Sequence, residues 1–455
     1  MIYQNAAALR RYMTLYAVAS LAVALVWGGP GAIIIPLHVQ QIEFARHFSG
    51  IDSSVNLQLL NELKTKVAAH LIVPSAEQAR LLAKLADFDA ARARGLSIVT
   101  SMGVFMTMLV QPVIGVLSDR TRSRRGRRAP WILVGTVVSV AGMLCFPLAG
   151  SILALVIIWS VIGVGTNAIA GPLAATVPDR VPESKIGTVS AITGLGTILG
   201  LVFGALAGGA LFNAFGVVGY LPFALIVGVC CPLFALGARD ASSRDLQAAR
   251  VGALTHLKGF TFALRDHDYR WVWIARVLLM FGYAVSTALS IYMLQSYIHP
   301  ALSATEAARF GPLLNVAGLP GTLIAMVTAG RWSDRIGRRK PFVIGSSILF
   351  AFAMTIPLQW PTLTGLFIMS AISGIAMGTF IIVDQAFLID VLPDHEAAGR
   401  DLGIGTLGTN LGQAMGPGIA GIVLAQTGSY GMILTVAIAI VLVAALAIIP
   451  VRGAR

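Results

Sequence analysis

Long apolar stretches constrain this chain more than any other feature of its sequence. A helix that crosses the hydrocarbon core of a bilayer needs about 20 consecutive, mostly apolar residues. Twelve such stretches follow one another, at roughly 14–37, 95–117, 130–150, 152–176, 187–212, 217–237, 271–297, 308–330, 341–358, 362–390, 401–425 and 429–450. Only 12% of the residues are charged, whereas a soluble domain carries about 25%. The sequence therefore predicts an all-α membrane protein with twelve transmembrane helices.

The basic residues predict how these helices are oriented. Most of the 33 Lys and Arg residues fall before the first stretch, after the last, or in alternate connections such as 120–128, 239–270 and 331–340. Short connections that are rich in Lys and Arg stay on the cytoplasmic side. We therefore expect a multi-pass protein of the plasma (inner) membrane with both termini in the cytoplasm. This placement explains the net charge of +13 without a nucleic-acid partner.

Two longer connections divide the chain into parts. We expect an N-terminal six-helix bundle over 1–238, a cytoplasmic linker with an amphipathic helix over 239–270, and a C-terminal six-helix bundle over 271–455. The amphipathic pattern of the linker consists of Leu254, Leu257, Phe260 and Leu264. The first bundle carries an outer helical loop over 39–94. Within it we predict either two helices or one helix and an extension of the second span.

Local patterns support helices in the outer loop. Ser75 and Gln78 have the spacing of a capping box, and Leu81, Leu82, Leu85 and Phe88 follow at helical intervals. An earlier stretch places Leu59, Leu60, Leu63 and Val67 on one helix face. The loop is predicted to be a structural lid, with a docking site for a partner or substrate as the alternative.

The two halves repeat each other at two places. The connection at 115–130, here called gate loop 1, resembles the connection at 330–341, gate loop 2. Glycines four residues apart recur at Gly196, Gly200, Gly204 and Gly208 and at Gly408, Gly412 and Gly416. The matching gate-loop positions are Gly115, Asp119, Arg120, Gly126, Arg127 and Arg128, and Gly330, Asp334, Arg335, Gly337, Arg338 and Arg339. The two gate loops fall on the same side, so the repeat is parallel, about an axis along the membrane normal.

These motifs have a physical interpretation. Glycines four apart let helix backbones approach closely, which suits helices that slide against a partner. Arginines can hold opposing carboxylates or lipid phosphates, so each gate loop can form a latch that breaks in another state. The alternative is that the arginines only set topology, but topology alone requires no Gly, Asp and Pro at fixed offsets.

The gate loops resemble the signature of the major facilitator superfamily. More narrowly, Ser118-Asp119-Arg120, Ser123-Arg124 and Gly126-Arg127-Arg128 with Pro130 resemble the loop of sucrose-type sugar–proton symporters of the glycoside–pentoside–hexuronide:cation group. The resemblance implies the major facilitator fold, with two pseudo-symmetric six-helix bundles. It also implies a cavity lined by helices 1, 4, 7 and 10, a moving seam of helices 2, 5, 8 and 11, and cytoplasmic gates at both loops. Melibiose-type members carry acidic cation ligands in helices 2 and 4, which the first six helices lack here.

Ionisable residues within spanning segments are functional candidates because their burial in a bilayer costs several kcal/mol. Arg276 and Asp384 lie at similar depths in helices 7 and 10. Asp390 lies nearer the boundary; it is a further proton-coupling candidate, and a contact with a gate arginine is expected there. We hypothesise that Asp384 takes up and releases a coupling proton while Arg276 adjusts its proton affinity. The alternative is a permanent ion pair that stabilises the second half.

Polar and aromatic residues on the expected cavity helices are candidate substrate contacts, because amides and aromatic faces suit a hydroxylated ligand. His38 lies at the outer mouth, where we expect a solvated side chain, with a titrating role as the alternative. The substrate-contact candidates are Trp27, Gln111, Asn167, Tyr283, Tyr292, Gln295, Gln385, Asn410 and Gln413.

Together these features predict a monomeric secondary transporter that works by alternating access. Its partners would be a small-molecule substrate, a proton as coupling ion and membrane lipids. The main hypothesis is symport of a sugar or related polyhydroxylated solute; the alternatives are export of amphipathic or apolar compounds, and a receptor-like protein that no longer transports. No nucleotide-binding loop, nucleophile elbow or metal cluster is evident, so we expect no enzyme activity, no cofactor and no metal.

Overall fold

The computed structural model describes residues 6–238, 242–243, 263–393 and 398–452. Every regular element in these ranges is helical. The amphipathic helix predicted in the linker falls mainly outside the described residues. Ten helical stretches among them are long and apolar enough to cross a membrane. One of the ten, 184–237, contains two helices, α7 and α8, and therefore counts as two spans. The glycine-rich helix α15 is not among the ten and adds one more, which gives the twelve expected spans.

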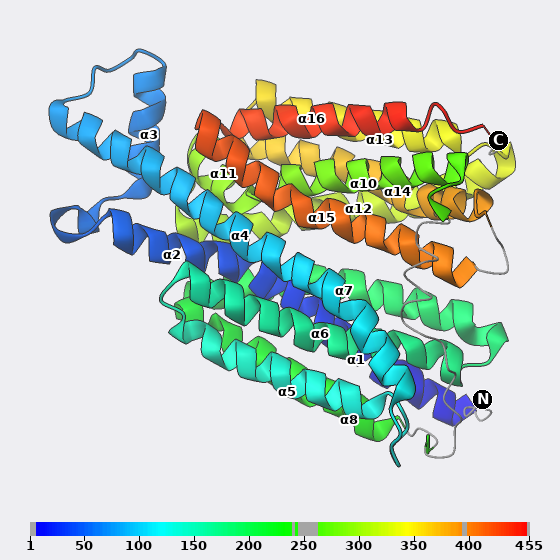
Figure 1. Cartoon of the computed structure of the whole chain (residues 1–455). Coiled ribbons are helices and arrows are strands. Elements are labelled where there is room, and N and C mark those ends of the chain that lie inside the picture. The colour runs from blue at the N-terminus through cyan, green and yellow to red at the C-terminus, as the bar shows by residue number, and fades with distance from the viewer. Residues whose placement is uncertain (1–5, 239–241, 244–262, 394–397, 453–455) are drawn as a thin grey trace. The chain divides into compact units, whose positions relative to one another are not determined.

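The first six spans use the following elements, drawn in Figure 1. They are α1 (Ala6–Val26), η1 (Trp27–Ile34), α2 (Ile35–His47), η2 (Gly50–Ser54), α3 (Leu57–Ala68), α4 (Ala76–Arg120), α5 (Ala129–Cys145), η3 (Phe146–Leu148), α6 (Ile152–Arg180), α7 (Glu183–Phe215), η4 (Gly216–Tyr220) and α8 (Leu221–Gly237). The first span is continuous from α1 to α2 but widens to a π-helix at η1, which contains Pro30.

The second six spans follow the same order. They are α10 (His267–Thr287) with α11 (Ser290–Ser296), α12 (Ala304–Ile336), α13 (Lys340–Gln359), α14 (Leu363–Asp390), α15 (Ala398–Thr427) and α16 (Tyr430–Ala447). Local chemistry sets several of the boundaries. Ser303 and Glu306 form a capping box at the start of α12, and Gly337, with φ of +66°, ends that helix.

The described residues group into two compact units. Unit 1 lies within Met1–Ile42 and Met102–Arg250, and unit 2 lies within Glu43–Ser101 and Val251–Arg455. The segment Glu43–Ser101 thus clusters with the C-terminal helices, whereas the sequence analysis placed the loop 39–94 in the N-terminal part. The long helix α4 contributes residues to both units.

Glycine stripes permit close helix packing within each unit. In unit 1, a Cβ added to Gly204 of α7 would lie 2.6 Å from the carbonyl oxygen of Leu25 in α1. In unit 2, a Cβ added to Gly412 of α15 would lie 2.5 Å from the carbonyl oxygen of Val277 in α10. Any side chain at these positions would force the two backbones apart. The predicted stripes are therefore contact surfaces with α1 and α10 of their own units.

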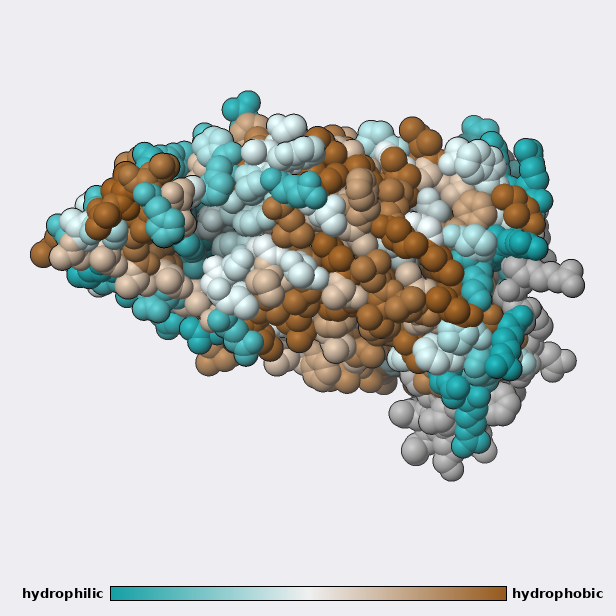
Figure 2. Space-filling view, turned by 90° about the horizontal axis from the view of Figure 1, so that it is seen from above, coloured by the Kyte–Doolittle hydropathy of each residue, from teal (hydrophilic) through white to brown (hydrophobic). Residues whose placement is uncertain are grey.

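Large apolar side chains also remain exposed on the outer faces of the helices, among them Val137 in α5, Leu225 in α8 and Phe352 in α13. On the face seen in Figure 2, hydrophobic residues, in brown, cover much of the middle, and hydrophilic residues, in teal, gather toward the two ends. This distribution fits helices surrounded by lipid along their length.

Candidate transport site, gates and outer segment

A buried ion pair joins α10 and α14 in unit 2. The Nε of Arg276 donates to Oδ2 of Asp384 at 2.6 Å, and the two side chains are only 6% and 4% exposed. A second guanidinium nitrogen donates to Oε1 of Gln385 at 3.2 Å. The other carboxylate oxygen of Asp384, Oδ1, is buried without a hydrogen-bond partner among the described residues. The structure thus brings together the two residues that the sequence placed at equal depth.

Gate loop 1 closes on two carboxylates. Arg128 forms an ion pair with Asp119 at 2.7 Å and donates hydrogen bonds to Asp179 at 3.2 Å and to Ser118 at 3.0 Å. Arg127 donates to Asp179 at 2.5 Å. The turn between helix and arginines depends on Gly126, whose φ of +81° is unfavourable for residues with a Cβ.

Gate loop 2 repeats this arrangement with fewer contacts. Arg339 pairs with Asp334 at 3.1 Å and also with Asp390, and Gly337 supplies the left-handed turn. Gly330 packs against α14, because an added Cβ would lie 3.0 Å from Ile382. The side chains of Arg335 and Arg338 are exposed. Asp390, a coupling candidate that the sequence also placed within reach of a gate arginine, pairs with Arg339.

Asp179 is a further carboxylate partner of gate loop 1, and the sequence patterns described above do not indicate it. It lies at the end of α6 just as Asp390 lies at the end of α14, and each of these carboxylates holds the arginine two residues before the gate-loop proline. A Pro-Asp pair follows the corresponding helix in both halves, in Val-Pro-Asp-Arg at 177–180 and in Leu-Pro-Asp-His at 392–395. Aligning the two pairs matches Asp179 with Asp394, whereas its structural counterpart is Asp390. That offset hides the equivalence.

Several predicted substrate contacts are committed to other roles. The amide nitrogen of Asn167 donates to the Gly163 carbonyl at 2.8 Å in its own helix, and Gln295 makes the same kind of bond to Ile291 at 3.4 Å. Tyr292 is buried under a guanidinium, as described below. Trp27 packs edge-on against Trp159, with ring centroids 5.2 Å apart.

The remaining candidates are more accessible. Tyr283 is half-buried and its ring lies 5.9 Å from that of Phe350. The half-buried and exposed amides are those of Gln111, Gln385, Asn410 and Gln413. His38 is buried rather than solvated, since its ring lies against Tyr220 with centroids 6.0 Å apart. The expectation of a solvated histidine is therefore wrong, because the first turn of α2, where His38 lies, is packed.

The outer segment, defined as residues 43–101, has a small core of its own. Phe48, Leu60, Leu85 and Phe88 are buried together, whereas Leu59, predicted on the same face as Leu60, is exposed. The capping box of Ser75 and Gln78 forms at the start of α4 as predicted. The second alternative is confirmed: α3 is the one separate α-helix among the described residues between α2 and α4, and α4 is an outward extension of the second span.

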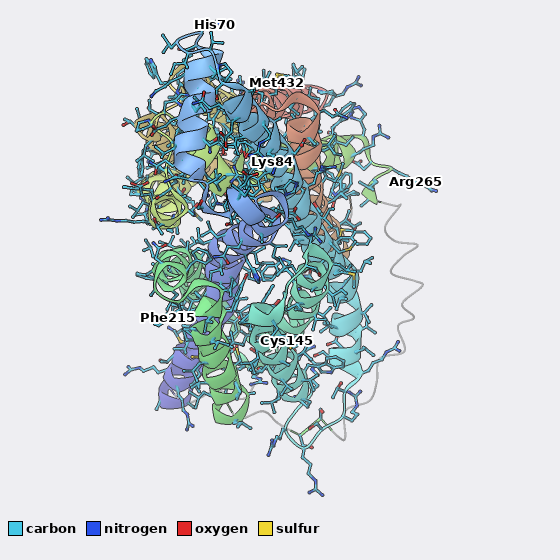
Figure 3. The ribbon with its side chains drawn as sticks, turned by 90° about the vertical axis from the view of Figure 1, so that its left-hand side faces the viewer. His70, Lys84, Cys145, Phe215, Arg265 and Met432 are labelled. Carbon is cyan, nitrogen blue, oxygen red and sulfur yellow. The ribbon has the colours of Figure 1, made fainter. Side chains whose placement is uncertain are left out.

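Charged side chains fasten the outer segment together. Arg80 donates two hydrogen bonds to Asp52, at 2.7 and 2.9 Å, and Lys84 donates another at 2.5 Å. These cations lower the pKa of the Asp52 carboxyl from 3.8 to about 2. Figure 3 labels Lys84 on α4 and His70 just beyond the end of α3.

A second buried arginine fixes the outer segment to the C-terminal helices of unit 2. Arg92 is 1% exposed, forms an ion pair with Asp89 at 2.7 Å and donates a hydrogen bond to Ser296 at 2.6 Å. Its guanidinium lies 4.5 Å from the ring centre of Tyr292 and 3.4 Å from the hydroxyl of Tyr430. The sequence gives no sign of this role, because Arg92 is one of several charged residues in the loop 39–94.

Apolar spans, two six-helix halves and paired gate loops define a multi-pass membrane transporter. The family model of the Major Facilitator Superfamily matches residues 81–321 and 298–454. The chain belongs to this superfamily. The narrower resemblance to the sucrose-type group has no further support.

Solved structures of transporters share this fold. A bacterial homolog of the human lysosomal transporter Spinster, in an inward-facing and unoccupied conformation, aligns with a TM-score of 0.64 and 14% identity over 98% of both chains. A mutant form of the nucleoside transporter NupG aligns with a TM-score of 0.69 and 12% identity over 96% of this chain and 98% of that chain. At these identities the likeness shows the fold alone. A comparison with curated proteins finds no match.

Proposed function

We propose that this transporter couples the movement of a proton to the uptake of a sugar or related polyhydroxylated solute. The observation that carries the proposal is the buried pair of Arg276 and Asp384 in contact with the exposed amide of Gln385. We further propose a monomer in the plasma membrane with both termini in the cytoplasm, as the distribution of basic residues predicts.

The chemistry of the pair supports coupling. A proton arriving at Oδ1 of Asp384, the oxygen that accepts no hydrogen bond from the described residues, would neutralise the carboxylate and weaken its hold on Arg276. The guanidinium would keep its contact with Gln385. A ligand hydroxyl that binds the Gln385 amide would compete for that contact. Proton and ligand would therefore act on the same arginine, which is the requirement for coupled movement.

Export of amphipathic or apolar compounds is the second candidate. Asn167 and Gln295 use their amide donors on their own helices, and Tyr292 is covered by Arg92. These residues supply fewer hydrogen bonds than a polyhydroxylated ligand requires.

Two measurements separate these functions. A thermal-shift screen of purified protein would compare sugars, glycosides, nucleosides and lipophilic amines. Stabilisation by hydroxylated ligands supports uptake, and stabilisation by lipophilic compounds alone would overturn it. Uptake of the stabilising ligand is then measured in proteoliposomes under an inward proton gradient.

The variant Asp384→Asn tests the coupling. We expect it to abolish gradient-driven uptake while ligand-dependent thermal stabilisation remains. Asp87→Asn is the matched control, since Asp87 is exposed on α4 and has no ion pair with any described residue. Gradient-driven uptake at the normal rate in Asp384→Asn would show that this carboxylate does not carry the proton.

A further inference from the structure

The end of α12 and the start of α13 carry cations that the gate does not use. Arg331, Arg335 and Arg338 are exposed and make no hydrogen bond or ion pair with any residue that the structure describes. The carboxylates nearest in the gate, Asp334 and Asp390, are both engaged by Arg339. At the point where a spanning helix ends, three positive charges therefore have no counter-ion among the described side chains.

Apolar side chains accompany these cations. Trp332 and Ile336 lie one helical turn apart and are 62% and 60% exposed. An open hollow next to them is lined by Ile336, Gly337, Arg338, Lys340, Pro341, Ile344 and Gly345. A Cβ added to Gly345 would meet no atom within 4 Å, so the hollow reaches the backbone of α13. A surface with both guanidinium groups and exposed apolar side chains at a membrane boundary suits an amphipathic anion.

Gate loop 1 lacks this combination. Its residues at the equivalent positions are Val116 and Leu117, where gate loop 2 has Arg331 and Trp332. The tryptophan that directly follows gate loop 1, Trp131, is half-buried and donates to the hydroxyl of Thr121 at 2.7 Å. Arg335 and Arg338 have counterparts in Arg120 and Arg127, whereas Arg331 and the exposed Trp332 occur in gate loop 2 alone.

We propose that the α12–α13 junction binds the headgroup of an anionic phospholipid. The phosphate would be held by Arg335 and Arg338 with Arg331 nearby, and the apolar part would contact Trp332 and Ile336. Because α12 is a spanning helix, the junction lies where lipid headgroups are concentrated. The site is separate from the buried pair and does not depend on which solute is transported.

The test uses lipid quenching of tryptophan fluorescence. The full chain is placed in phosphatidylcholine nanodiscs that contain a minor fraction of a lipid brominated on its acyl chains. The brominated lipid is phosphatidylglycerol in one preparation and phosphatidylcholine in the other. The contribution of Trp332 is obtained by difference from Trp332→Phe. We expect the brominated anionic lipid to quench it several-fold more per mole than the brominated neutral lipid, since each cation favours an anionic lipid by roughly fivefold.

Two variants and one control locate the effect. Arg335→Gln/Arg338→Gln should remove most of the preference, and Gly345→Phe should lower it by filling the hollow while all charges remain. Arg124→Gln/Arg125→Gln removes two exposed cations from gate loop 1 and should leave the preference unchanged. Equal quenching by both lipids, or equal loss in both double variants, would overturn the proposal. So would loss of the preference on addition of inorganic phosphate, which would indicate a site for a free anion.

Discussion

At the scale of single residues, the pair of Arg276 and Asp384 illustrates how a buried charge depends on its partner. Both side chains are nearly inaccessible, and the pair is closed at 2.6 Å. Removing one partner leaves an uncompensated charge in a low-dielectric interior, which typically costs about 3–5 kcal/mol. We expect Arg276→Gln to lower the midpoint of thermal unfolding in detergent strongly.

The double variant Arg276→Gln/Asp384→Asn provides the control for this prediction. It removes both charges and leaves two amides that can hydrogen-bond, so its unfolding midpoint should exceed that of Arg276→Gln. If the destabilisations of Arg276→Gln and Asp384→Asn add up to that of the double variant, the two residues do not interact as a pair in the folded protein. The comparison needs no knowledge of the substrate.

Arg92 is the residue whose role depends most on tertiary structure. Its guanidinium contacts Asp89, Ser296 and Tyr292. We expect Arg92→Met to leave Asp89 with Lys64, at 3.4 Å, as its nearest cation, and to loosen the outer segment. Hydrogen exchange should then accelerate in α3, α11 and the first turns of α4.

Two variants test whether the geometry of Arg92 matters or only its charge. Arg92→Lys keeps the charge but cannot donate along two directions from a planar group, so an intermediate effect is expected. Arg94 is exposed, and among the described residues its side chain bonds only to the Ala90 carbonyl. The backbone amides of Arg94→Met should therefore exchange hydrogen at the same rate as those of the parent. Unchanged exchange in Arg92→Met would show that the outer segment is held by its apolar contacts alone.

At the scale of elements, the ion pairs around Asp52 give the outer segment a defined pH dependence. The pKa of Asp52 is lowered in the folded protein, from 3.8 to about 2, by Arg80 and Lys84. A lowered folded pKa means that the stabilisation is fully present above the unfolded pKa and is lost as the pH falls through the folded pKa. The contacts should therefore persist at mildly acidic pH.

Comparison with Asp52→Asn measures this dependence. Hydrogen exchange of α3 should be faster in the variant than in the parent by a constant factor between about pH 7 and pH 5, because Asp52 stays charged throughout that range. The difference should shrink only at lower pH. A difference that already disappears at the upper end of this range would mean that the Asp52 carboxyl is not held in its charged form by its partners.

At the scale of the whole molecule, the sequence predicted the fold well because membrane burial is a local property. Each span could be recognised from its own composition, and the capping box of Ser75 and Gln78 from their spacing alone. The contact of Arg276 with Asp384 followed from their matching depths. Asp179, Arg92 and the burial of His38 could not be predicted in this way, because they depend on which distant helices meet.

The two gate loops have similar ion pairs but bury them to different extents. In gate loop 1, Asp179 receives hydrogen bonds from Arg127 and Arg128, and Arg128 is 7% exposed. In gate loop 2, Asp390 pairs with Arg339, which is 20% exposed and is its one ion-pair partner in the described part of the chain. Ion pairs between exposed groups contribute about 0–1 kcal/mol, and the loss of a partner costs more as burial increases.

We therefore expect Asp179→Asn to lower the unfolding midpoint more than Asp390→Asn does. Asp119→Asn and Asp334→Asn extend the comparison, since each removes the second carboxylate of the same arginine, at 2.7 and 3.1 Å. All four variants change the net charge equally, so differences between them report the local contacts. Equal midpoints for Asp179→Asn and Asp390→Asn would show that the greater burial of Arg128 adds nothing. The expected ordering would instead mean that the two halves share a latch design while unit 1 holds its latch more firmly.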